Sequence, residues 1–317
     1  MKNKKYKIAI IGGGVCGLYL AQKLADKGNN VYVFEKKKEI GDNVVCSGLF
    51  SKRILDFFPK SEKLIQNRIN SAILHFPKKD IKLQFLKQFL IIKHSDLEKI
   101  AGDSALNSGV KIFLNHNIED INNLSKNFNK IIGCDGYYSV VRQSLNLLNP
   151  YFRLGIQGFI KGKSIDDYVD VWPCKNGFIW KIPQGNETEY GIISTPQLAK
   201  KLFEEFLKRE RISIDNIKAK IIPQGFIIPS NNSITLCGDA AGLTKPWSGG
   251  GVIWGLKAAD ILLDSFPNFI AYRKKAKKFF LPKIIFSKFL TKIVYFLGFK
   301  MSYLFPKNNR IDPDFLL

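Results

Sequence analysis

The glycine-rich stretch at residues 7–35 constrains the fold more than any other part of the chain. It reads KIAIIGGGVCGLYLAQKLADKGNNVYVFE: an apolar run to Ile11, then a G-x-G-x-x-G turn, a helical pattern and a second apolar run that ends at Glu35. Strand, glycine turn, helix, strand and acidic residue within about 30 residues are typical of a dinucleotide-binding βαβ unit. The stretch therefore predicts a Rossmann-like domain.

The residue types in this stretch suit a bound pyrophosphate. Gly12 permits a tight exit from the strand, Gly14 lets the backbone approach the phosphates, and Gly17 lets the helix pack close to the sheet. The start of the helix offers N–H groups and the positive end of its dipole. Glu35 can accept hydrogen bonds from both ribose hydroxyls and would repel a 2′-phosphate. We therefore expect FAD or NAD rather than NADP.

A second glycine-rich segment, residues 234–263, reads ITLCGDAAGLTKPWSGGGVIWGLKAADILL. Its apolar run leads to Asp239, whose carboxylate can bind a hydroxyl of a ribityl chain. Three glycines then precede a helical pattern, and the N–H groups at such a helix start suit the O2 and N1 edge of a reduced isoalloxazine ring. An ordinary βα turn is the alternative, and the first motif makes a flavin the better explanation.

The charge and cysteine content narrow the classes of function. There are 49 Lys and Arg against 27 Asp and Glu, a net charge of +22, which suits an anionic membrane, nucleic acid or an acidic partner. A lysine-rich genome is the alternative explanation. No compact patch of basic and aromatic residues favours nucleic acid, so we expect none to bind. The five cysteines form no C-x-x-C pair, which predicts reduced thiols and no metal site.

We expect a cytoplasmic protein. The chain runs from MKNKKYK directly into the first strand, which leaves no room for a signal peptide, and no run of 18 apolar residues predicts a spanning helix.

The expected fold class is α/β: a Rossmann-like FAD-binding domain interleaved with a mainly antiparallel β-sheet substrate domain, plus a helical C-terminal tail. The strand-like runs between residues 69 and 92 predict short strands, and a helix is expected at 197–211. The expected boundaries are 1–68, 93–150 and 223–270 for the FAD-binding domain, 69–92 and 151–222 for the substrate domain, and 271–317 for the tail.

The tail combines a basic cluster with an amphipathic pattern. We expect a helix after Pro282 with Ser287, Lys288, Thr291 and Lys292 on its polar face. Its apolar face would consist of Phe286, Phe289, Leu290, Ile293, Phe296 and Leu297. Such a helix is typical of one that lies on an anionic membrane surface, and packing on the protein's own core is the alternative.

Three segments together resemble the fingerprints of FAD-dependent enzymes built like the aromatic hydroxylases: the two glycine segments and GCDGYYSVVR at 133–142. Within that superfamily, the chain is similar to the geranylgeranyl reductase family. The motifs that carry this similarity are CSGL at 46–49, GFIWKIP at 177–183 and GDAAGLTKPWSGGGVIWGL at 238–256.

This resemblance implies reduction of C=C bonds in geranylgeranyl chains, on archaeal-type ether lipids, with hydride from reduced FAD. The electron donor stays open between a ferredoxin-like protein and NAD(P)H. The implied cofactor site consists of Gly12, Gly14, Val15, Cys16, Gly17, Glu35, Cys46, Ser47, His94, Asp135, Asp239, Gly250, Gly251 and Val252. The residues expected to line the substrate cavity are Phe178, Trp180, Pro183 and Trp247, with sheet core as the alternative for the aromatic residues of the strand.

The chain departs from the family pattern in three places. His94 stands where the superfamily usually has an Arg that helps to hold FAD, so we expect a flavin affinity that is lower or depends on pH. Val15 replaces the usual Pro. The chain is also short after residue 260, so we expect part of the C-terminal substrate region to be missing or remodelled.

Two other functions remain open. An aromatic monooxygenase or a quinone side-chain reductase would use the same flavin fold, and the monooxygenase would couple oxygen uptake to hydroxylation. A non-catalytic, membrane-associated flavin-binding protein is the second alternative, favoured by His94 and by the short C-terminal part.

Overall fold

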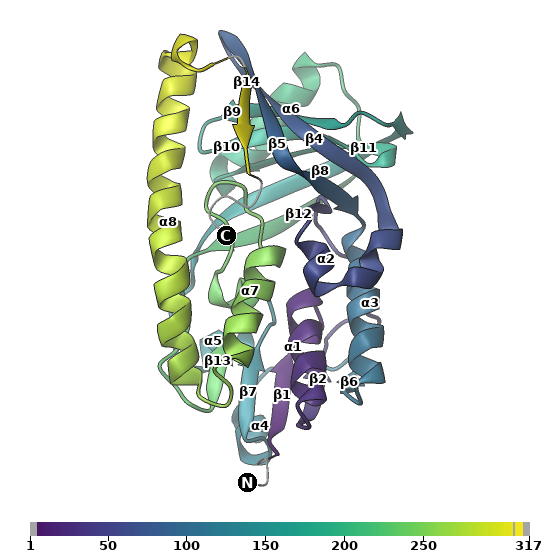
Figure 1. Cartoon of the computed structure of the whole chain (residues 1–317), viewed down its shortest axis with the longest axis vertical. Helices are drawn as coiled ribbons and strands as arrows, with labels where there is room; N and C mark the ends of the chain where they lie inside the picture. Colours follow the sequence, from purple (N-terminus) through teal and green to yellow (C-terminus); the bar gives the residue numbers. More distant parts are fainter. Residues whose placement is uncertain (1–4, 307, 313–317) are drawn as a thin grey trace. The chain divides into compact units, whose positions relative to one another are not determined.

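The described residues, 5–306 and 308–312 of a computed structural model, fall into two units that the chain visits alternately (Figure 1). The first unit consists of Met1–Val44, Ser95–Tyr151 and Pro223–Ile284. The second consists of Val45–His94, Phe152–Ile222 and Ile285–Leu317. Each unit is described below by itself.

In the described part of the chain, the first unit is built on a five-stranded parallel sheet with the strand order β13-β7-β1-β2-β6. Ile8 and Ile10 of the central strand are fully buried, as expected where both faces of a parallel sheet are covered. The strands are β1 (Lys7–Ile11), β2 (Asn30–Phe34), β6 (Lys111–Phe113), β7 (Lys130–Gly133) and β13 (Ile234–Leu236).

Two helices of the first unit follow the carboxyl ends of strands β1 and β13. The glycine turn leads from β1 into the first helix, and a short 3-10 turn and a loop lead from β13 into α7. Tyr19 donates a hydrogen bond to Asp260 at 2.8 Å and so links the first helix to α7. The helical elements are α1 (Val15–Asp26), α3 (His94–Asn107), α4 (Asn122–Asn127), α5 (Val140–Ser144), η2 (Gly238–Ala241) and α7 (Val252–Leu263).

The second unit is built on a mainly antiparallel sheet of nine strands, counted over the described residues, with the order β12-β8-β11-β10-β9-β4-β5-β14 and β3 paired to β5. Only the pairs β4–β9 and β5–β14 are parallel among the pairings described. The strands are β3 (Leu49–Ser51), β4 (Ile65–Phe76), β5 (Lys79–Ile92), β8 (Tyr151–Ser164), β9 (Tyr168–Cys174), β10 (Gly177–Pro183), β11 (Gly185–Ser194), β12 (Asp215–Gln224) and β14 (Asn308–Ile311).

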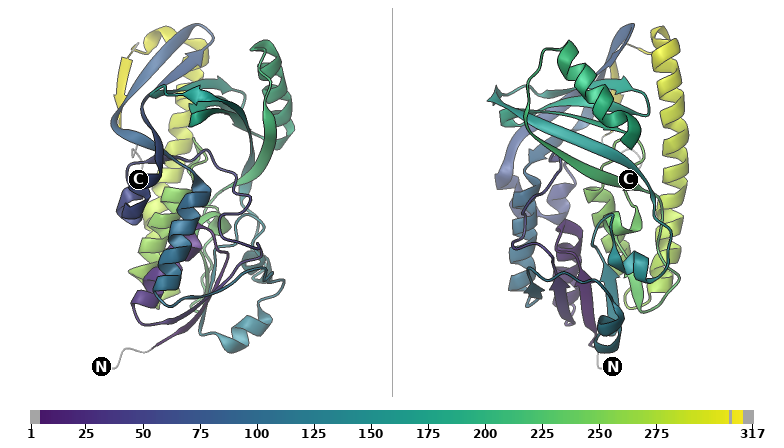
Figure 2. Two further views of the ribbon diagram at one scale, coloured as in Figure 1. Left: turned by 90° about the vertical axis from the view of Figure 1, so that its right-hand side faces the viewer. Right: turned by 180° about the vertical axis from the view of Figure 1, so that it is seen from behind.

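The two faces of this sheet carry separate apolar clusters. Helix α6 (Pro196–Arg209) lies over one face of this sheet (Figure 2). Its Phe203 and Phe206 pack around Ile179 and Ile192. On the other face, Ile182 belongs to a cluster with residues of β4, β5 and β9, and Trp180 packs against it. The alternation of β10 therefore sends odd-numbered side chains toward α6 and even-numbered ones to the opposite face. The unit also contains α2 (Ile54–Phe57), η1 (Pro59–Leu64) and η3 (Ser302–Leu304).

The predicted short strands between residues 69 and 92 are wrong, because β4 and β5 form one long hairpin of 12 and 14 residues. Residues 45–68, which we assigned to the FAD-binding domain, fall in the second unit. The reason is that β3 and the start of β4 both pair with β5, far along the chain.

The C-terminal helix α8 (Phe269–Lys300) differs from the prediction in its start and in its faces. It runs unbroken through Pro282, so the expected start after Pro282 is wrong. Ser287, predicted on the polar face, is 1% exposed. Gly298 lies against Phe76, and Tyr295 donates a hydrogen bond to the carbonyl of Gly177 at 2.6 Å. Within the described residues, no helix is long and apolar enough to cross a membrane.

Candidate functional site

The glycine turn between β1 and α1 contains two positions where a Cβ would clash with the backbone and one, Gly14, where it would not. A Cβ at Gly12, where φ is +104°, would lie 2.4 Å from the carbonyl oxygen of Cys134. A Cβ at Gly17 would lie 2.1 Å from the carbonyl oxygen of Gly12. At Gly14 the nearest atom would be Oε1 of Glu98, at 3.5 Å. The turn thus leaves room for a ligand at Gly14, directly before the first N–H groups of α1.

Glu35 lies beside this turn with its carboxylate held in place. It follows β2 and is 7% exposed. Its Oε2 accepts a hydrogen bond from the N–H of Gly13 at 2.5 Å, and its Oε1 accepts one from the N–H of Lys37 at 2.9 Å. Each oxygen keeps capacity for a further donor. The side chain is therefore fixed and still able to accept hydrogen bonds from ribose hydroxyls.

The second glycine segment brings another carboxylate to a helix start. Asp239 lies in η2, and a Cβ at Gly251 would be only 2.7 Å from its Oδ1. Gly251 is the N-cap of α7, and no side chain caps that helix. Gly250 precedes it, and Val252 is the first helical residue. The predicted carboxylate and the predicted helix start thus lie together.

Asp135 has a structural role and one further acceptor. Its Oδ2 accepts hydrogen bonds from the N–H groups of Val140 and Val141, at 2.7 and 3.4 Å, and so caps α5. Its Oδ1 is buried and has no hydrogen-bond partner among the residues that the structure describes. Burial raises the pKa of this carboxyl group. A buried acceptor without a protein donor is costly, and it fits a site where a ligand supplies the donor.

Cys16 does not direct its side chain to the cofactor side of the turn. Its Sγ lies 3.5 Å from Sγ of Cys237 and 3.4 Å from the carbonyl oxygen of Gly255. A hydrogen bond with Cys134 raises the pKa of Cys16, and burial raises that of Cys237. These thiols are protonated interior groups, so only the backbone of Cys16 is left for a cofactor.

In the second unit, Cys46 and His94 form a pair that the sequence did not predict as a pair. Both are half-buried, and they are joined by a side-chain hydrogen bond. Gly48 directs its N–H toward Sγ of Cys46 at 3.5 Å. Burial raises the pKa of Cys46, but the charge and hydrogen bond of His94, the Gly48 N–H and the charge of Lys220 outweigh it and lower the pKa below its ordinary value. Cys46 is therefore more readily a thiolate than an ordinary cysteine.

A buried carboxyl group, Glu189, connects this pair to the predicted substrate residues. Its Oε1 accepts a hydrogen bond from the indole N–H of Trp180 at 2.7 Å, and its Oε2 accepts one from the amide of Gln184 at 2.8 Å. The same amide donates to the carbonyl oxygen of Ser47 at 2.7 Å. Glu189 is 0% exposed, and burial raises its pKa to about 8. Sequence reasoning missed Glu189, because it lies among polar residues in the first half of β11, which reads GNETEYGIIS.

The predicted substrate residues do not form one cluster. The rings of Phe178 and Trp180 lie 5.8 Å apart on the same face of β10. The alternation of β10 puts Pro183 on the other face, so it does not join them. Trp247 belongs to the first unit, where it is 36% exposed and Nζ of Lys245 lies 5.6 Å from its ring centre.

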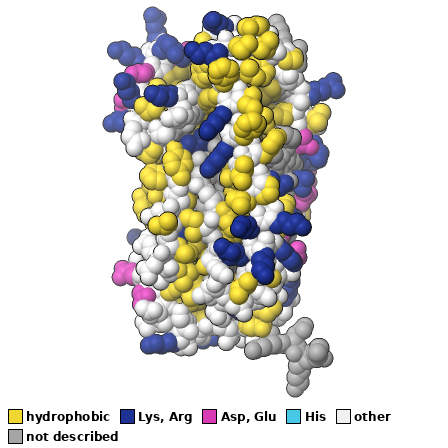
Figure 3. Space-filling view, turned by 90° about the vertical axis from the view of Figure 1, so that its left-hand side faces the viewer, with side chains coloured by type: hydrophobic (Ala, Val, Ile, Leu, Met, Phe, Trp, Pro, Cys, Tyr) yellow, Lys and Arg dark blue, Asp and Glu magenta, His cyan; other side chains and the backbone are white. Residues whose placement is uncertain are grey.

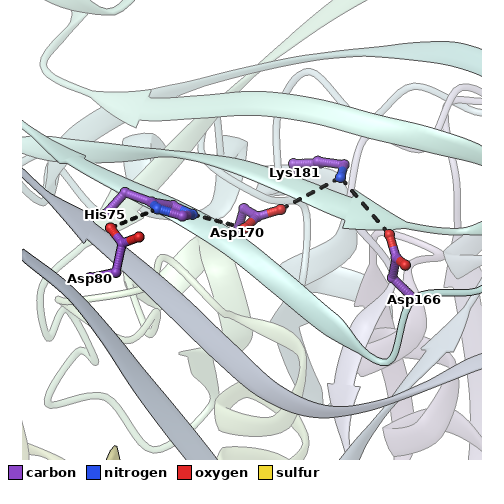
Figure 4. A network of polar contacts seen from close by, with 5 residues as sticks. All are labelled: His75, Asp80, Asp166, Asp170 and Lys181. Carbon is purple, nitrogen blue, oxygen red and sulfur yellow. Dashed lines mark hydrogen bonds and ion pairs between the residues drawn. The ribbon is translucent and has the colours of Figure 1, made fainter. Parts of the chain in front are cut away.

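A polar network crosses β4, β9 and β10 on the sheet (Figure 4). His75 lies between Asp80 and Asp170, at 3.0 and 2.8 Å, and Nζ of Lys181 lies 3.6 Å from Asp170 and 3.9 Å from Asp166. Lys181 alternates with Trp180, so this network belongs to the face away from Glu189. We interpret it as a partly solvated link between strands. Within the described residues, no group of His, Cys, Asp and Glu is arranged to hold a metal ion.

Comparison with known proteins assigns the architecture. A family model for an NAD(P)-binding Rossmann-like domain matches residues 10–47. A geranylgeranyl bacteriochlorophyll reductase-like protein from Thermoplasma acidophilum matches with a TM-score of 0.74 and 19% identity, over 93% of this chain and 92% of that one. A flavin-dependent brominase matches with a TM-score of 0.74 and 14% identity, over 95% and 91%. The fold is that of flavin-dependent oxidoreductases, and the predicted fold class is confirmed.

Two of the relatives found by sequence share one name, whereas the structural matches include different kinds of flavin-dependent enzyme. Digeranylgeranylglycerophospholipid reductase 1 of Methanococcoides burtonii is 25% identical in an alignment that covers 78% of this chain and 71% of the relative. The namesake protein of Methanosphaera stadtmanae is also 25% identical, over 80% of this chain and 72% of the relative. The resemblance to the geranylgeranyl reductase family that the motifs predicted is thereby confirmed. Together the comparisons relate the chain to flavin-dependent enzymes by fold and to geranylgeranyl reductases by sequence.

Proposed function

We propose that this chain is an FAD-dependent reductase of the C=C bonds in geranylgeranyl chains, with archaeal-type ether lipids as its substrates. The observation that carries the proposal is the similarity to two digeranylgeranylglycerophospholipid reductases over more than three quarters of the chain. Two carboxylates placed at the starts of α1 and α7 support the cofactor part of the proposal.

The residues of the first unit fit FAD. Glu35 would accept the ribose hydroxyls, and Gly14, which has no Cβ, would let the pyrophosphate approach the start of α1. Asp239 would accept a ribityl hydroxyl beside the start of α7, and the free Oδ1 of Asp135 offers a further acceptor. When bound and reduced, FAD supplies the hydride for the C=C bond.

The second unit contributes the proposed substrate surface. Phe178 and Trp180 present half-buried aromatic rings on one sheet face, and a prenyl chain requires such an apolar surface. We propose that these two residues line the substrate site, with Trp247 of the first unit as a third candidate. A ferredoxin-like protein or NAD(P)H is proposed as the electron donor.

The test is a single-turnover reduction without oxygen. The purified protein is reduced with dithionite, mixed with a geranylgeranyl ether lipid and analysed by mass spectrometry. The expected result is a mass gain in steps of two hydrogens with reoxidation of the flavin. Oxygen uptake coupled to hydroxylation would show a monooxygenase instead. A flavin that stays reduced with every prenyl lipid would favour a non-catalytic flavin-binding protein.

We further propose that the outer face of α8 rests on an anionic membrane at the cytoplasmic side. Ile285, Phe289 and Phe296 are 62%, 61% and 60% exposed, although they are large apolar residues. Figure 3 shows hydrophobic side chains along this side of the molecule with Lys and Arg beside them. Lys288 and Lys292 lie between these residues in the sequence and are exposed as well. An apolar stripe next to cations matches the chemistry of an anionic lipid surface.

The membrane proposal is tested by sedimentation with vesicles. Phe289→Glu combined with Phe296→Glu is expected to weaken binding to anionic vesicles more than tenfold, since burial of each ring contributes about 1.5–3 kcal/mol. The control is Leu148→Glu, at an exposed apolar residue far from this face in the sequence. Equal loss in the two proteins, or no binding by the unaltered chain, would contradict the proposal.

A further inference from the structure

Glu189 joins residues from three segments of the second unit. Trp180 comes from β10, Gln184 from the turn after it, and Ser47 from the loop before β3. The carboxyl group accepts one hydrogen bond on each oxygen, and the Gln184 amide continues the chain of hydrogen bonds to the carbonyl of Ser47. The network thus ends at the loop that carries Cys46.

The position of the Trp180 indole depends on β11, the strand that carries Glu189. Trp180 is directly opposite Gly191 of β11, and a Cβ at Gly191 would lie 2.3 Å from Cζ2 of the indole. The indole therefore lies flat over the backbone of β11, where only glycine leaves space for it. Glu189, two residues earlier on the same face, accepts the indole N–H and fixes the direction of the ring.

We propose that Glu189 is a positioning residue that holds Trp180 and, through Gln184, the Cys46–Ser47 loop in the arrangement that the reductase needs. This inference rests on the proposed function, because Trp180 is there a residue of the substrate site. Nothing else in the network is fully buried and charged in its ordinary state, so Glu189 is the member whose ionisation would disturb the others.

The surroundings of Glu189 favour its neutral form. Burial raises the pKa of Glu189 most, Cys46 and Glu187 also raise it, and the hydrogen bonds from Trp180 and Gln184 lower it, so that the pKa is about 8. On the Cys46 side, His94 and Lys220 are the positive groups. At neutral pH the site therefore holds a protonated Glu189 beside a thiol that ionises readily. If Glu189 and Cys46 both ionise, two negative charges lie close together, which is unfavourable.

The test compares Glu189→Gln and Glu189→Ala with the unaltered protein. Gln does not titrate, and its carbonyl oxygen can accept the indole N–H of Trp180, although its amide nitrogen cannot accept the hydrogen bond from Gln184. We expect kcat/KM of the unaltered protein to fall as the pH rises through about 8, where Glu189 ionises, and we expect E189Q to lack this fall. E189A leaves the indole N–H without its acceptor, so we expect KM for the lipid to rise about tenfold with unchanged flavin content. Glu62→Gln, at an exposed glutamate of the same unit that is not part of this network, is the control.

A second measurement does not depend on lipid turnover. Tryptophan fluorescence of the unaltered protein is expected to change with an apparent pKa near 8, and this change should be absent in both E189Q and Trp180→Phe. Suppose that the protein reduces no prenyl lipid, but the fluorescence change near pH 8 is present in the unaltered protein and absent in E189Q and Trp180→Phe. The proposed function is then wrong, and the inference that Glu189 positions Trp180 is supported. If lipid is reduced and both Glu189 variants keep the original pH profile and fluorescence titration, the inference about Glu189 is overturned.

Discussion

At the scale of single residues, the ionisation of Cys46 depends on neighbours that are distant in sequence. His94, Gly48 and Lys220 together favour the thiolate, whereas Cys174 in the same unit has a pKa raised to about 11 by burial. We predict that iodoacetamide labels Cys46 faster than Cys174 at neutral pH, because the thiolate fractions differ about a hundredfold or more. His94→Asn should slow labelling of Cys46 and leave Cys174 unchanged. Equal labelling of the two cysteines, measured by peptide mass spectrometry, would contradict this.

The protonation of Glu189 also predicts a dependence of stability on pH. The carboxyl group titrates at about 8 in the folded protein against an ordinary value of 4.5, so between these values the folded chain holds a proton that the unfolded chain has released. The stability that this bound proton contributes is fully present below pH 4.5 and is lost as the pH rises through about 8. We predict a fall of up to about 1.4 kcal/mol per pH unit. The free energy of unfolding, measured with urea at several pH values, should fall less with pH in E189Q than in the unaltered protein. If it falls equally in both proteins, the prediction is wrong.

Glu35 and Asp239 carry the cofactor assignment at this scale. We predict that Glu35→Ala and Asp239→Ala each weaken FAD binding about ten- to a hundredfold, because each removes charge-assisted hydrogen bonds. Flavin absorbance of the purified protein and a binding titration measure the effect, with the exposed Glu39→Ala as control. Unchanged flavin content in both variants would remove the FAD assignment.

These residues also show what the sequence could predict. The packing of Gly12 and Gly17 follows from spacing alone, because the strand, turn and helix are local. Glu189 was missed because its role depends on the register between β10 and β11, which sets Trp180 opposite Gly191. Pro183 was grouped with Trp180 from motif spacing, although an odd offset in a strand reverses the face.

At the scale of secondary-structure elements, α8 shows how packing overrides a local signal. Proline inside a helix loses one hydrogen bond, which made Pro282 a reasonable expected start. Tyr272 and Phe280 before it and Ser287 after it are nonetheless buried, so both halves are held by contacts. The prediction of the polar face was wrong for the same reason. Ser287 is buried and Gly298 lies against Phe76, so this side of the helix packs on the rest of the protein.

The contact at Gly298 allows a test of this packing. Alanine is a better helix former than glycine by about 1 kcal/mol, but its Cβ would lie 2.1 Å from the ring of Phe76. Overpacking of this kind costs about 1–3 kcal/mol, so we predict that Gly298→Ala lowers the free energy of unfolding. Phe76→Leu should relieve part of the loss in the double variant. A more stable Gly298→Ala protein would mean that the helix is not held against Phe76.

At the scale of the whole molecule, the net charge of +22 bears on any anionic partner. If the charge contributes to membrane binding, raising the salt concentration must weaken binding to anionic vesicles, because screening shortens the range of the attraction. We predict a marked decrease between low and near-physiological salt, while binding to zwitterionic vesicles stays weak throughout. Sedimentation that does not change with salt would assign binding to the apolar stripe alone.

The interleaved organisation was predictable in outline, since both glycine segments pointed to one nucleotide-binding sheet. The exact segments were not, because β3 has only three residues and its pairing with β5 spans some forty residues of chain. Long-range pairing of this kind leaves no periodic signal in the sequence.

The order of the strands in the first sheet also affects how the protein is made. β7 pairs with β1 on one side and with β13 on the other, yet β13 is the last of the five to leave the ribosome. At about 5–20 residues per second, roughly 10–40 s pass between the synthesis of β2 and that of β13. During this time the hydrophobic edge of the growing sheet is open to chaperones and to other nascent chains, and the long β4–β5 hairpin is completed first.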